Sequence, residues 1–393
     1  MNKISVIKIL LIASIFLSSC NSYNVINVSK VQTSTFAKYP GIYYALPQTV
    51  ITIDVNVTAK EYIKGPYAAF SNKFLGISNP ITSNCVTYKI TDIKLGYYVE
   101  PDPLNFYYVE IKNRLLKNKL FSFISLDEAG IIQSFNDINN FSYYQKKPDY
   151  INYLPSSNDE SFIQYSGTNF IEKVDTLLEK VFQDTIIFEK QMLKSTYIEK
   201  TTEQKAIEAA DFILKLHEYK VNLLSGLQEV PYSKEVMEYM INKLENMETE
   251  YLKLFTGYTK TSVFKYRYSY TPSQSLTDSI IIIPLFKFSP ELGILNLDNS
   301  KGETASLKIV KNGANNILSN YLNNINNPSR KEKKLFYRIP ENVKISLIIN
   351  NEVKADAVMQ VAQLGSIAKI PLNKNKIIFW NNTGAIKTIS FSK

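Results

Sequence analysis

Few residues in this chain of 393 residues could carry catalytic or metal chemistry. The sequence contains one histidine, His217, and two cysteines, Cys20 and Cys85. A zinc site with two imidazole ligands is therefore excluded, and a nucleophile–histidine pair would have to use His217. His217 lies in a helical stretch, so we expect it on a helix surface or in helix packing. We expect no metal ion or other cofactor.

Carboxylates alone can hydrolyse a glycosidic bond, because two acids about 5–10 Å apart suffice without a histidine. The acids at predicted turns are Asp102, Asp127 and Glu128. Aspartate beside proline or glycine also stabilises turns by accepting backbone hydrogen bonds. We therefore interpret these acids as turn residues and expect a protein that is not an enzyme. A carboxylate-based hydrolase is the second alternative.

The best-defined chemistry is lipidation at Cys20. Lys3 and Lys8 precede an apolar segment, Ile9–Leu17, that is shorter than the roughly 20 residues needed to span a bilayer. The segment is typical of a signal peptide, and it ends in Leu17-Ser18-Ser19-Cys20, which resembles the lipobox of bacterial lipoproteins. We predict a signal peptide at residues 1–20 and a lipid anchor on Cys20.

Charge and cysteine content limit the classes of partner. The formal net charge is +9, and removal of residues 1–20 with their two lysines leaves +7. No arginine- or lysine-rich tract of the nucleic-acid type is present, so we expect no nucleic-acid partner. The basic cluster Arg330–Lys334 is interpreted as a solvated loop. Cys85 is the only other cysteine, so the mature chain should have no intramolecular disulfide.

Alternating apolar residues predict an N-terminal β domain at residues 41–170, preceded by a polar tether at residues 21–40. Thr49–Val57 places Ile51, Ile53, Val55 and Val57 on one face of a strand. Further strands are expected on both sides of Glu100–Pro103, where two prolines predict a turn. Three segments each combine an apolar strand, a polar turn, a glycine and an apolar restart, which predicts hairpins. They are Phe123–Ile132, Phe286–Leu295 and Ile377–Ile386.

Neighbouring tyrosines recur along the predicted strands. Because adjacent strand residues point to opposite faces, each pair should place one ring in the core and one outside. Exposed rings together with Trp380 could stack on sugars, which makes a glycan-binding lipoprotein the first alternative function. The pairs are Tyr43-Tyr44, Tyr97-Tyr98, Tyr107-Tyr108 and Tyr143-Tyr144.

The middle of the chain is predicted to be a helical region at residues 171–257, with a helical hairpin at 201–256. Thr201 and Gln204 form a capping-box pattern, and Ser233 can cap a second helix. A C-terminal β domain is expected at 258–393. The fold class is therefore α+β, mostly β, with two antiparallel β regions and a long antiparallel helical hairpin between them. The two predicted apolar stripes are Ala206, Ala210, Ile213, Val221 and Leu224 on the first helix, and Val236, Met240, Leu244, Met247, Tyr251 and Leu254 on the second.

Several segments together resemble an uncharacterised outer-membrane lipoprotein family of the Bacteroidota, a domain of unknown function. These segments are Gly41–Val50, Gly65–Ala68, Phe74–Gly76, Glu100–Pro103, Glu250–Gly257, Phe336–Pro340 and Val361–Gly365. The resemblance implies an outer-membrane location and supplies no catalytic residues.

With that location, we expect a non-catalytic interaction or scaffold module, accessory to an outer-membrane protein complex. The expected partners are an outer-membrane barrel or further lipoproteins. The residues after Cys20, Asn21–Asn24, carry no acid, which favours the periplasmic face over the cell surface.

Overall fold

The computed structural model describes residues 26–32, 40–111, 124–137, 162, 169–183, 186–226, 232–274, 279–312, 318, 334–372 and 375–391. One end of the molecule contains β1 (Ile26–Lys30), β2 (Gly41–Ile63), β3 (Cys85–Ile111), β4 (Ile124–Leu126), β5 (Ile132–Phe135), β9 (Ile280–Ser289), β10 (Gly293–Leu295), β11 (Glu303–Lys311), β12 (Lys334–Ile349), β13 (Glu352–Pro371), β14 (Asn375–Phe379) and β15 (Ile386–Phe391). The other end contains η1 (Ala68–Phe70), α2 (Ser71–Leu75), β6 (Phe170–Gln183), β7 (Ile186–Glu199), α4 (Thr202–Ser225) and α5 (Lys234–Thr256), and β8 (Tyr258–Tyr270) leads back.

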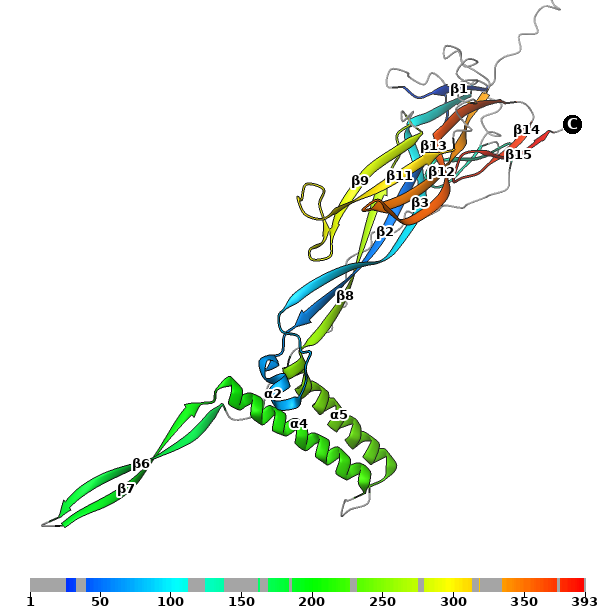
Figure 1. The fold of residues 1–393 in the computed structure, drawn as a ribbon. Helices are drawn as coiled ribbons and strands as arrows, with labels where there is room; N and C mark the ends of the chain where they lie inside the picture. Colours follow the sequence, from blue (N-terminus) through cyan, green and yellow to red (C-terminus); the bar gives the residue numbers. More distant parts are fainter. Residues whose placement is uncertain are drawn as a thin grey trace, which may run out of the picture.

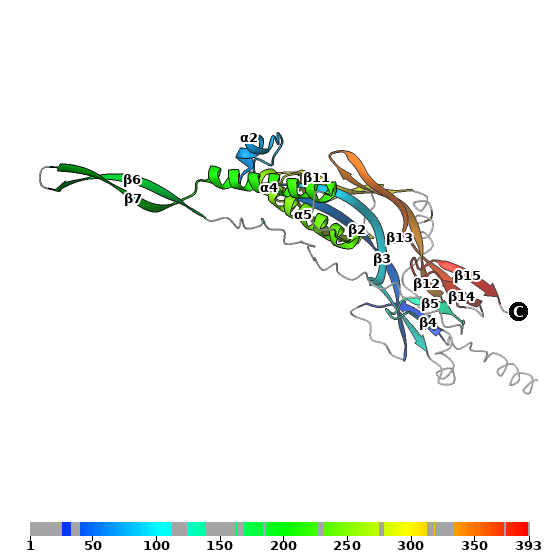
Figure 2. The same ribbon diagram turned by 90° about the horizontal axis from the view of Figure 1, so that it is seen from below.

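The molecule is elongated, with a β-rich body at one end (Figure 1). Strands β2, β3 and β8 leave the body as a long ribbon that reaches the helices. Beyond the helices, the hairpin β6–β7 projects away from the rest of the chain (Figures 1 and 2). We call α4, α5, β6 and β7, residues 170–256, the distal arm.

Strand β2 is a central strand of its sheet, because other strands pair with it on both sides. Over 23 residues it pairs antiparallel with β3, and from Ile51 to Ile63 it also pairs antiparallel with β8. The predicted alternation is confirmed, since Ile51, Ile53 and Val55 are fully buried. β-branched side chains fit such a pleated, buried surface, which explains why this segment becomes a central strand.

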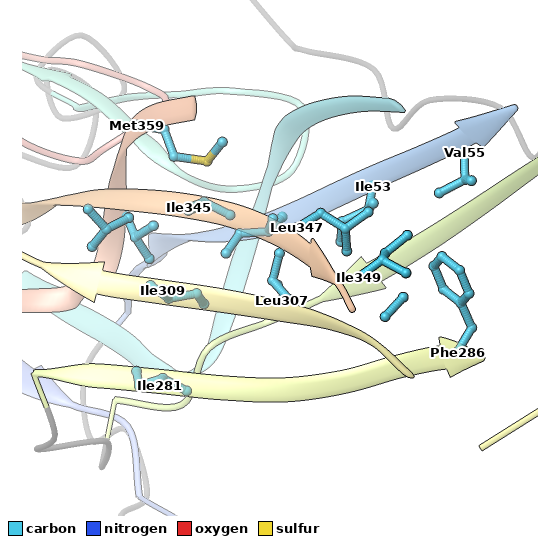
Figure 3. Packing of buried hydrophobic residues seen from close by; sticks show 14 of the residues in the cluster. Ile53, Val55, Ile281, Phe286, Leu307, Ile309, Ile345, Leu347, Ile349 and Met359 are labelled. Atoms are coloured by element: carbon cyan, nitrogen blue, oxygen red, sulfur yellow. The ribbon is translucent and has the colours of Figure 1, made fainter. Parts of the chain in front are cut away.

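The main core lies between two antiparallel sheets. One has the strand order β1-β3-β2-β8 and the other β10-β9-β11-β12-β13. Ile53 and Val55 of the first sheet face Leu307, Ile345 and other apolar residues of the second (Figure 3). Burying each such side chain stabilises the fold by about 1.5–3 kcal/mol relative to leaving it exposed. The core therefore joins residues before the helices to residues after them.

This shared core corrects the predicted division into two separate β regions. The described strands before the distal arm and those after it do not form independent domains, because β8 pairs with β2 and β14 pairs with β5. A second core also draws on both halves of the chain, including Tyr44, Tyr107, Leu335 and Ile377. Pairings between residues more than 200 positions apart leave no local pattern in a sequence.

Part of the predicted tether is also wrong. Residues 26–30 form β1, which pairs antiparallel with the end of β3. Val28 and Asn27 are buried there, at 2% and 4% exposure. β1 is an edge strand of five residues, and Val28 is its one apolar residue whose burial is described. So short an alternation is too weak to be recognised in the sequence alone.

The three glycine hairpins are confirmed. Strands β4 and β5, β9 and β10, and β14 and β15 each pair antiparallel across a short turn. Their glycines, Gly130, Gly293 and Gly384, have φ of 83°, 77° and 70°. These left-handed values are why the turns need glycine.

The predicted turn at Glu100–Pro103 is an interruption inside one strand. β3 runs through both prolines, but its register with β2 jumps between Ala45–Phe106 and Pro47–Pro101. The extra residues on β3 form a bulge, which is where a sheet tolerates proline.

The described residues within 171–199 are strands rather than helix, in contrast to the prediction. They form most of the β6–β7 hairpin, whose strands pair along their whole length. The register places Asp175 opposite Lys194, Glu179 opposite Lys190 and Lys180 opposite Glu189. Opposite charges at such cross-strand positions stabilise a sheet. A search for helical periodicity along the sequence does not detect them.

The helix boundaries follow the predicted caps. Thr201 and Gln204 form the complete capping box at the start of α4, and the hydroxyl of Ser233 accepts from the backbone of Val236 at the start of α5. Of the predicted stripes, Ala206, Ala210, Ile213, Tyr251 and Leu254 are buried. Val221, Leu224, Val236 and Met247 are exposed, and Met240 and Leu244 are half-buried, so the stripes are fully covered only near the body.

Gly257 sets the joint between α5 and β8, and its replacement should weaken the fold. Its φ of 74° and ψ of −175° lie in a region that essentially only glycine adopts, and a Cβ would approach the carbonyl oxygen of Ile63 to 2.3 Å. We expect Gly257→Ala to lower the free energy of unfolding by about 2 kcal/mol or more, measured by urea denaturation. Gly76 is the control because its φ is 67° with open space around it. Gly76→Ala should cost about 1 kcal/mol, and equal losses would contradict the steric account.

Candidate functional site

The residues with reactive side chains are dispersed. Cys20 lies outside the described residues, and Cys85 is a free, exposed thiol on β3. The His217 side chain on α4 is 61% exposed, and its Nδ1 lies 3.8 Å from Oε1 of Glu248 on α5. His217 is therefore a helix-surface residue, which is one of the two placements expected for it. Of the cluster Arg330–Lys334, only Lys334 is described, in β12.

Asp127 performs turn chemistry, as predicted. Its Oδ1 accepts hydrogen bonds from the backbone N–H groups of Ala129 at 3.0 Å and Ile131 at 2.8 Å. Burial raises the pKa of Asp127 and these backbone donors lower it. The neighbouring Glu128 is exposed. The Asp127 carboxylate thus holds the turn between β4 and β5.

Asp102 is the most buried of the three acids, and its role is an internal ion pair. It sits in the bulge of β3 with 3% exposure, and its Oδ2 is hydrogen-bonded by the guanidinium of Arg338, which is fully buried on β12. Its carboxylate also accepts from the backbone of Leu104 and the amide of Asn105, both at 2.8 Å. Each oxygen of Asp102 is therefore bonded inside the protein.

Arg338 extends this pair to other strands of the body. Its Nη1 donates to the carbonyl of Ala362 on β13 at 3.3 Å, and its backbone N–H donates to Gly384 in the β14–β15 turn at 3.1 Å. Burial lowers the pKa of Arg338, while the Asp102 carboxylate raises it. Nearby, Gln363 exchanges two 2.8 Å hydrogen bonds with the backbone of Thr49. The polar network joins the two sheets where the apolar core ends.

The tyrosine pairs contribute few open rings. Tyr44, Tyr98, Tyr107 and Tyr108 are buried, which leaves the predicted in-and-out pattern intact only for Tyr43-Tyr44. Tyr43 is 55% exposed, and its ring is tilted by 42° against that of Tyr108, with the ring centroids 4.6 Å apart. Tyr143-Tyr144 lies outside the described residues.

Trp380 is 49% exposed on the body and is covered by Lys387, whose Nζ lies 4.6 Å from the ring centroid. Among the described residues that were predicted to stack on sugars, Tyr43 and Trp380 are therefore the exposed rings.

Many of the exposed large apolar side chains among the described residues lie on the distal arm. Where it meets the ribbon, Ala206, Ala210, Tyr251 and Phe255 form a small core with Tyr67. Further from the ribbon, the helices are joined by Lys220, whose Nζ donates to Glu248 at 2.8 Å. That hydrogen bond raises the pKa of Lys220.

The outer surfaces of the arm are rich in uncovered apolar side chains. On α4, Leu214 and Leu224 are 58% and 63% exposed. On the hairpin, Leu193 and Tyr197 of β7 are 73% and 72% exposed. Large exposed apolar areas typically mark interaction surfaces. The other exposed apolar residues of the arm are Phe170, Ile171, Val174, Ile198, Ile207, Tyr219, Val221, Tyr232, Val236, Tyr239 and Met247.

Sequence reasoning missed the hairpin surface because it assigned residues 171–199 to a helical region. No period-two alternation was available as a signal, because Phe170–Val174 has two apolar residues followed by two charged ones. Among the described residues, no helix is long and apolar enough to cross a membrane.

Comparison with known proteins places the chain in a family. Residues 40–387 match the family described as Domain of unknown function (DUF4831), so the chain belongs to this family. The expected membership of a domain of unknown function is thereby confirmed. No curated protein and no solved structure matches the chain.

The buried pair Asp102–Arg338 should behave as a structural unit. We expect Arg338→Met to lower the free energy of unfolding by about 3–5 kcal/mol, because it leaves a buried carboxylate unpaired. The double change Asp102→Leu with Arg338→Met should lose much less, measured by urea denaturation in a double-mutant cycle.

Lys344 provides the control on the same strand. It pairs with Asp356 at 3.1 Å, with both side chains more than half exposed. Lys344→Met should change stability by at most about 1 kcal/mol. If Arg338→Met were as mild as Lys344→Met, the pair would not be the structural junction described.

Proposed function

We propose that this chain is a non-catalytic interaction or scaffold module, anchored to the outer membrane through a lipid on Cys20 and accessory to an outer-membrane protein complex. The observation that carries the proposal is the distal arm. It exposes apolar side chains on two paired helices and a β hairpin, away from the body. The body uses its buried acids and tyrosines for structure, so its described residues add no support to a carboxylate-based hydrolase or a glycan-binding role.

The position of β1 supports a directional arrangement. Ile26, the first residue of β1, lies only six positions after Cys20. Six residues span at most about 20 Å, so a lipid on Cys20 would hold the body close to the membrane surface. Strand β1 and the hairpin β6–β7 lie at opposite ends of the molecule (Figure 1). The arm would therefore project from the membrane toward its partner, on the periplasmic face in our proposal.

The anchor predicts a simple change of location. Cys20→Ala removes the acylated sulfur, and we expect the chain to move from the membrane pellet to the soluble fraction of the cell envelope. Ser19→Thr, which leaves the cysteine in place, is the control and should remain in the pellet. Retention of Cys20→Ala in the pellet at the wild-type level would contradict the lipid anchor.

The arm predicts loss of partner binding without loss of stability. We expect a tagged chain from detergent-solubilised outer membranes to retain an outer-membrane barrel or another lipoprotein in stoichiometric amounts, measured by quantitative mass spectrometry. Leu214→Lys with Leu224→Lys should abolish this retention, because lysines on an apolar contact surface carry a desolvation penalty. Both positions are more than half exposed, so the unfolding free energy should change by no more than about 0.5 kcal/mol.

Val358→Lys is the matched control, because Val358 is 76% exposed but lies on β13 of the body. It should leave the co-purifying protein in place. If the parent chain returned alone, or if Val358→Lys removed the partner while the arm variant kept it, the assignment of the arm as the interaction surface would be wrong.

A further inference from the structure

The hairpin β6–β7 has two free edges among the described residues, since its sheet contains only these two strands. A two-stranded hairpin is marginally stable alone in water, and an open strand edge is a template for pairing with another strand. The described side chains are exposed on both faces, as shown by Phe170 at 56% and Ile171 at 39%. The open strand edges and exposed apolar side chains of the hairpin thus suit pairing with a strand of another chain.

The sequence of β6 is complementary to itself when the strand is reversed about Thr176. In an antiparallel pairing of two copies centred on this residue, five kinds of flanking pair join apolar to apolar residues or lysine to glutamate. The sixth, next to the axis, places Asp175 opposite Leu177. The five complementary pairs are Phe170 and Phe182, Ile171 and Val181, Glu172 and Lys180, Lys173 and Glu179, and Val174 and Leu178.

The register is specified by charge as well as by apolar matching. Moving the centre to residue 175 would place Asp175 opposite its own copy, and moving it to residue 177 would place Asp175 opposite Glu179. Like charges directly opposite are destabilising, whereas the centre at Thr176 has none. The paired positions also differ by even numbers, so each pair lies on the same face of the joined sheet.

We propose that β6 of one copy pairs antiparallel with β6 of a second copy about a two-fold axis at Thr176. The result is a four-stranded sheet in the order β7-β6-β6-β7, which joins two distal arms. A symmetric dimer contact of this kind is isologous and closes after two copies. The proposal rests on the register of β6 and is independent of the lipid anchor and of any other partner.

A cysteine cross-link tests the register in the full chain. In a Cys85→Ser background, Thr176→Cys should form a disulfide-linked dimer under mild oxidation, because directly opposite strand residues have Cα atoms about 4.5–5.5 Å apart. Lys173→Cys should not cross-link, since its two copies would lie six positions apart along the strand, about 20 Å. The Cys85→Ser parent reports any dimer formed through Cys20.

Leu193→Cys is the matched control for the edge. Leu193 lies directly opposite Thr176 in the hairpin, but on β7. Cross-linking of Thr176→Cys without cross-linking of Leu193→Cys is the expected result. No dimer at Thr176→Cys, equal yields at Lys173→Cys, or a dimer through Leu193→Cys would each overturn the proposal.

Complementary charge variants test the same contact without cysteines. The first variant carries Glu172→Lys and Lys173→Glu, at positions that face uncharged residues within the hairpin. The second carries Glu179→Lys and Lys180→Glu, with Glu189→Lys and Lys190→Glu to keep the pairs inside its own hairpin. Two differently tagged copies of the parent should co-purify, and two copies of either variant should not.

Mixing one copy of each charge variant should restore co-purification. Each lysine at positions 172, 173, 179 and 180 then again lies opposite a glutamate. Co-purification of two copies of the first variant at the parent level would overturn the proposal, and so would a parent that never co-purifies with itself. Leu214→Lys with Leu224→Lys should remove a foreign partner but leave the co-purification of two tagged copies unchanged. The proposed function and the β6 pairing can therefore be refuted independently of each other.

Discussion

The antiparallel ladder between β2 and β3 supports each of the other units of the molecule. At one end, Tyr44 of β2 and Tyr107 of β3 enter the second core with β14. In the middle, the apolar face of β2 packs on the sheet of β9, β11, β12 and β13. At the far end, Gly65 and Gly257 allow the ribbon and α5 to approach closely. A strand of 23 residues is about 75 Å long, so this one ladder also sets the distance between body and arm.

The physics of the body and of the arm differ. The body buries apolar side chains from both halves of the chain and closes its polar junction with Asp102 and Arg338. The arm has a compact core only where α4 and α5 meet residues 67–75. Beyond that core, the arm has the buried Leu216 and Leu223 of α4, helix caps, the Lys220–Glu248 hydrogen bond and cross-strand pairs. Those interactions leave apolar surface exposed to water. A protein-binding role therefore accounts for the arm better than a catalytic role does.

The sequence predicted those features that are determined by residues close together in the chain. The alternation in Thr49–Val57, the capping box at Thr201 and the glycine hairpins all depend on residues within a few positions of each other. The sequence marked Asp102 as a polar residue beside prolines, but its partner Arg338 lies 236 positions away. The sharing of cores between residues 41–111 and 258–391 is equally non-local. The β6–β7 hairpin was missed because its strands are stabilised by pairs across the turn rather than along the chain.

The central claim is that the distal arm, rather than the body, makes the functional contact. Hydrogen exchange followed by mass spectrometry tests it directly, by comparing the purified chain alone with the chain retained in its solubilised outer-membrane assembly. The account predicts slower exchange in the assembly for α4, α5 and β7, above all in the outer turns of α4, with little change in β2, β12 and β13. Protection confined to the strands of the body, with an unchanged arm, would contradict it.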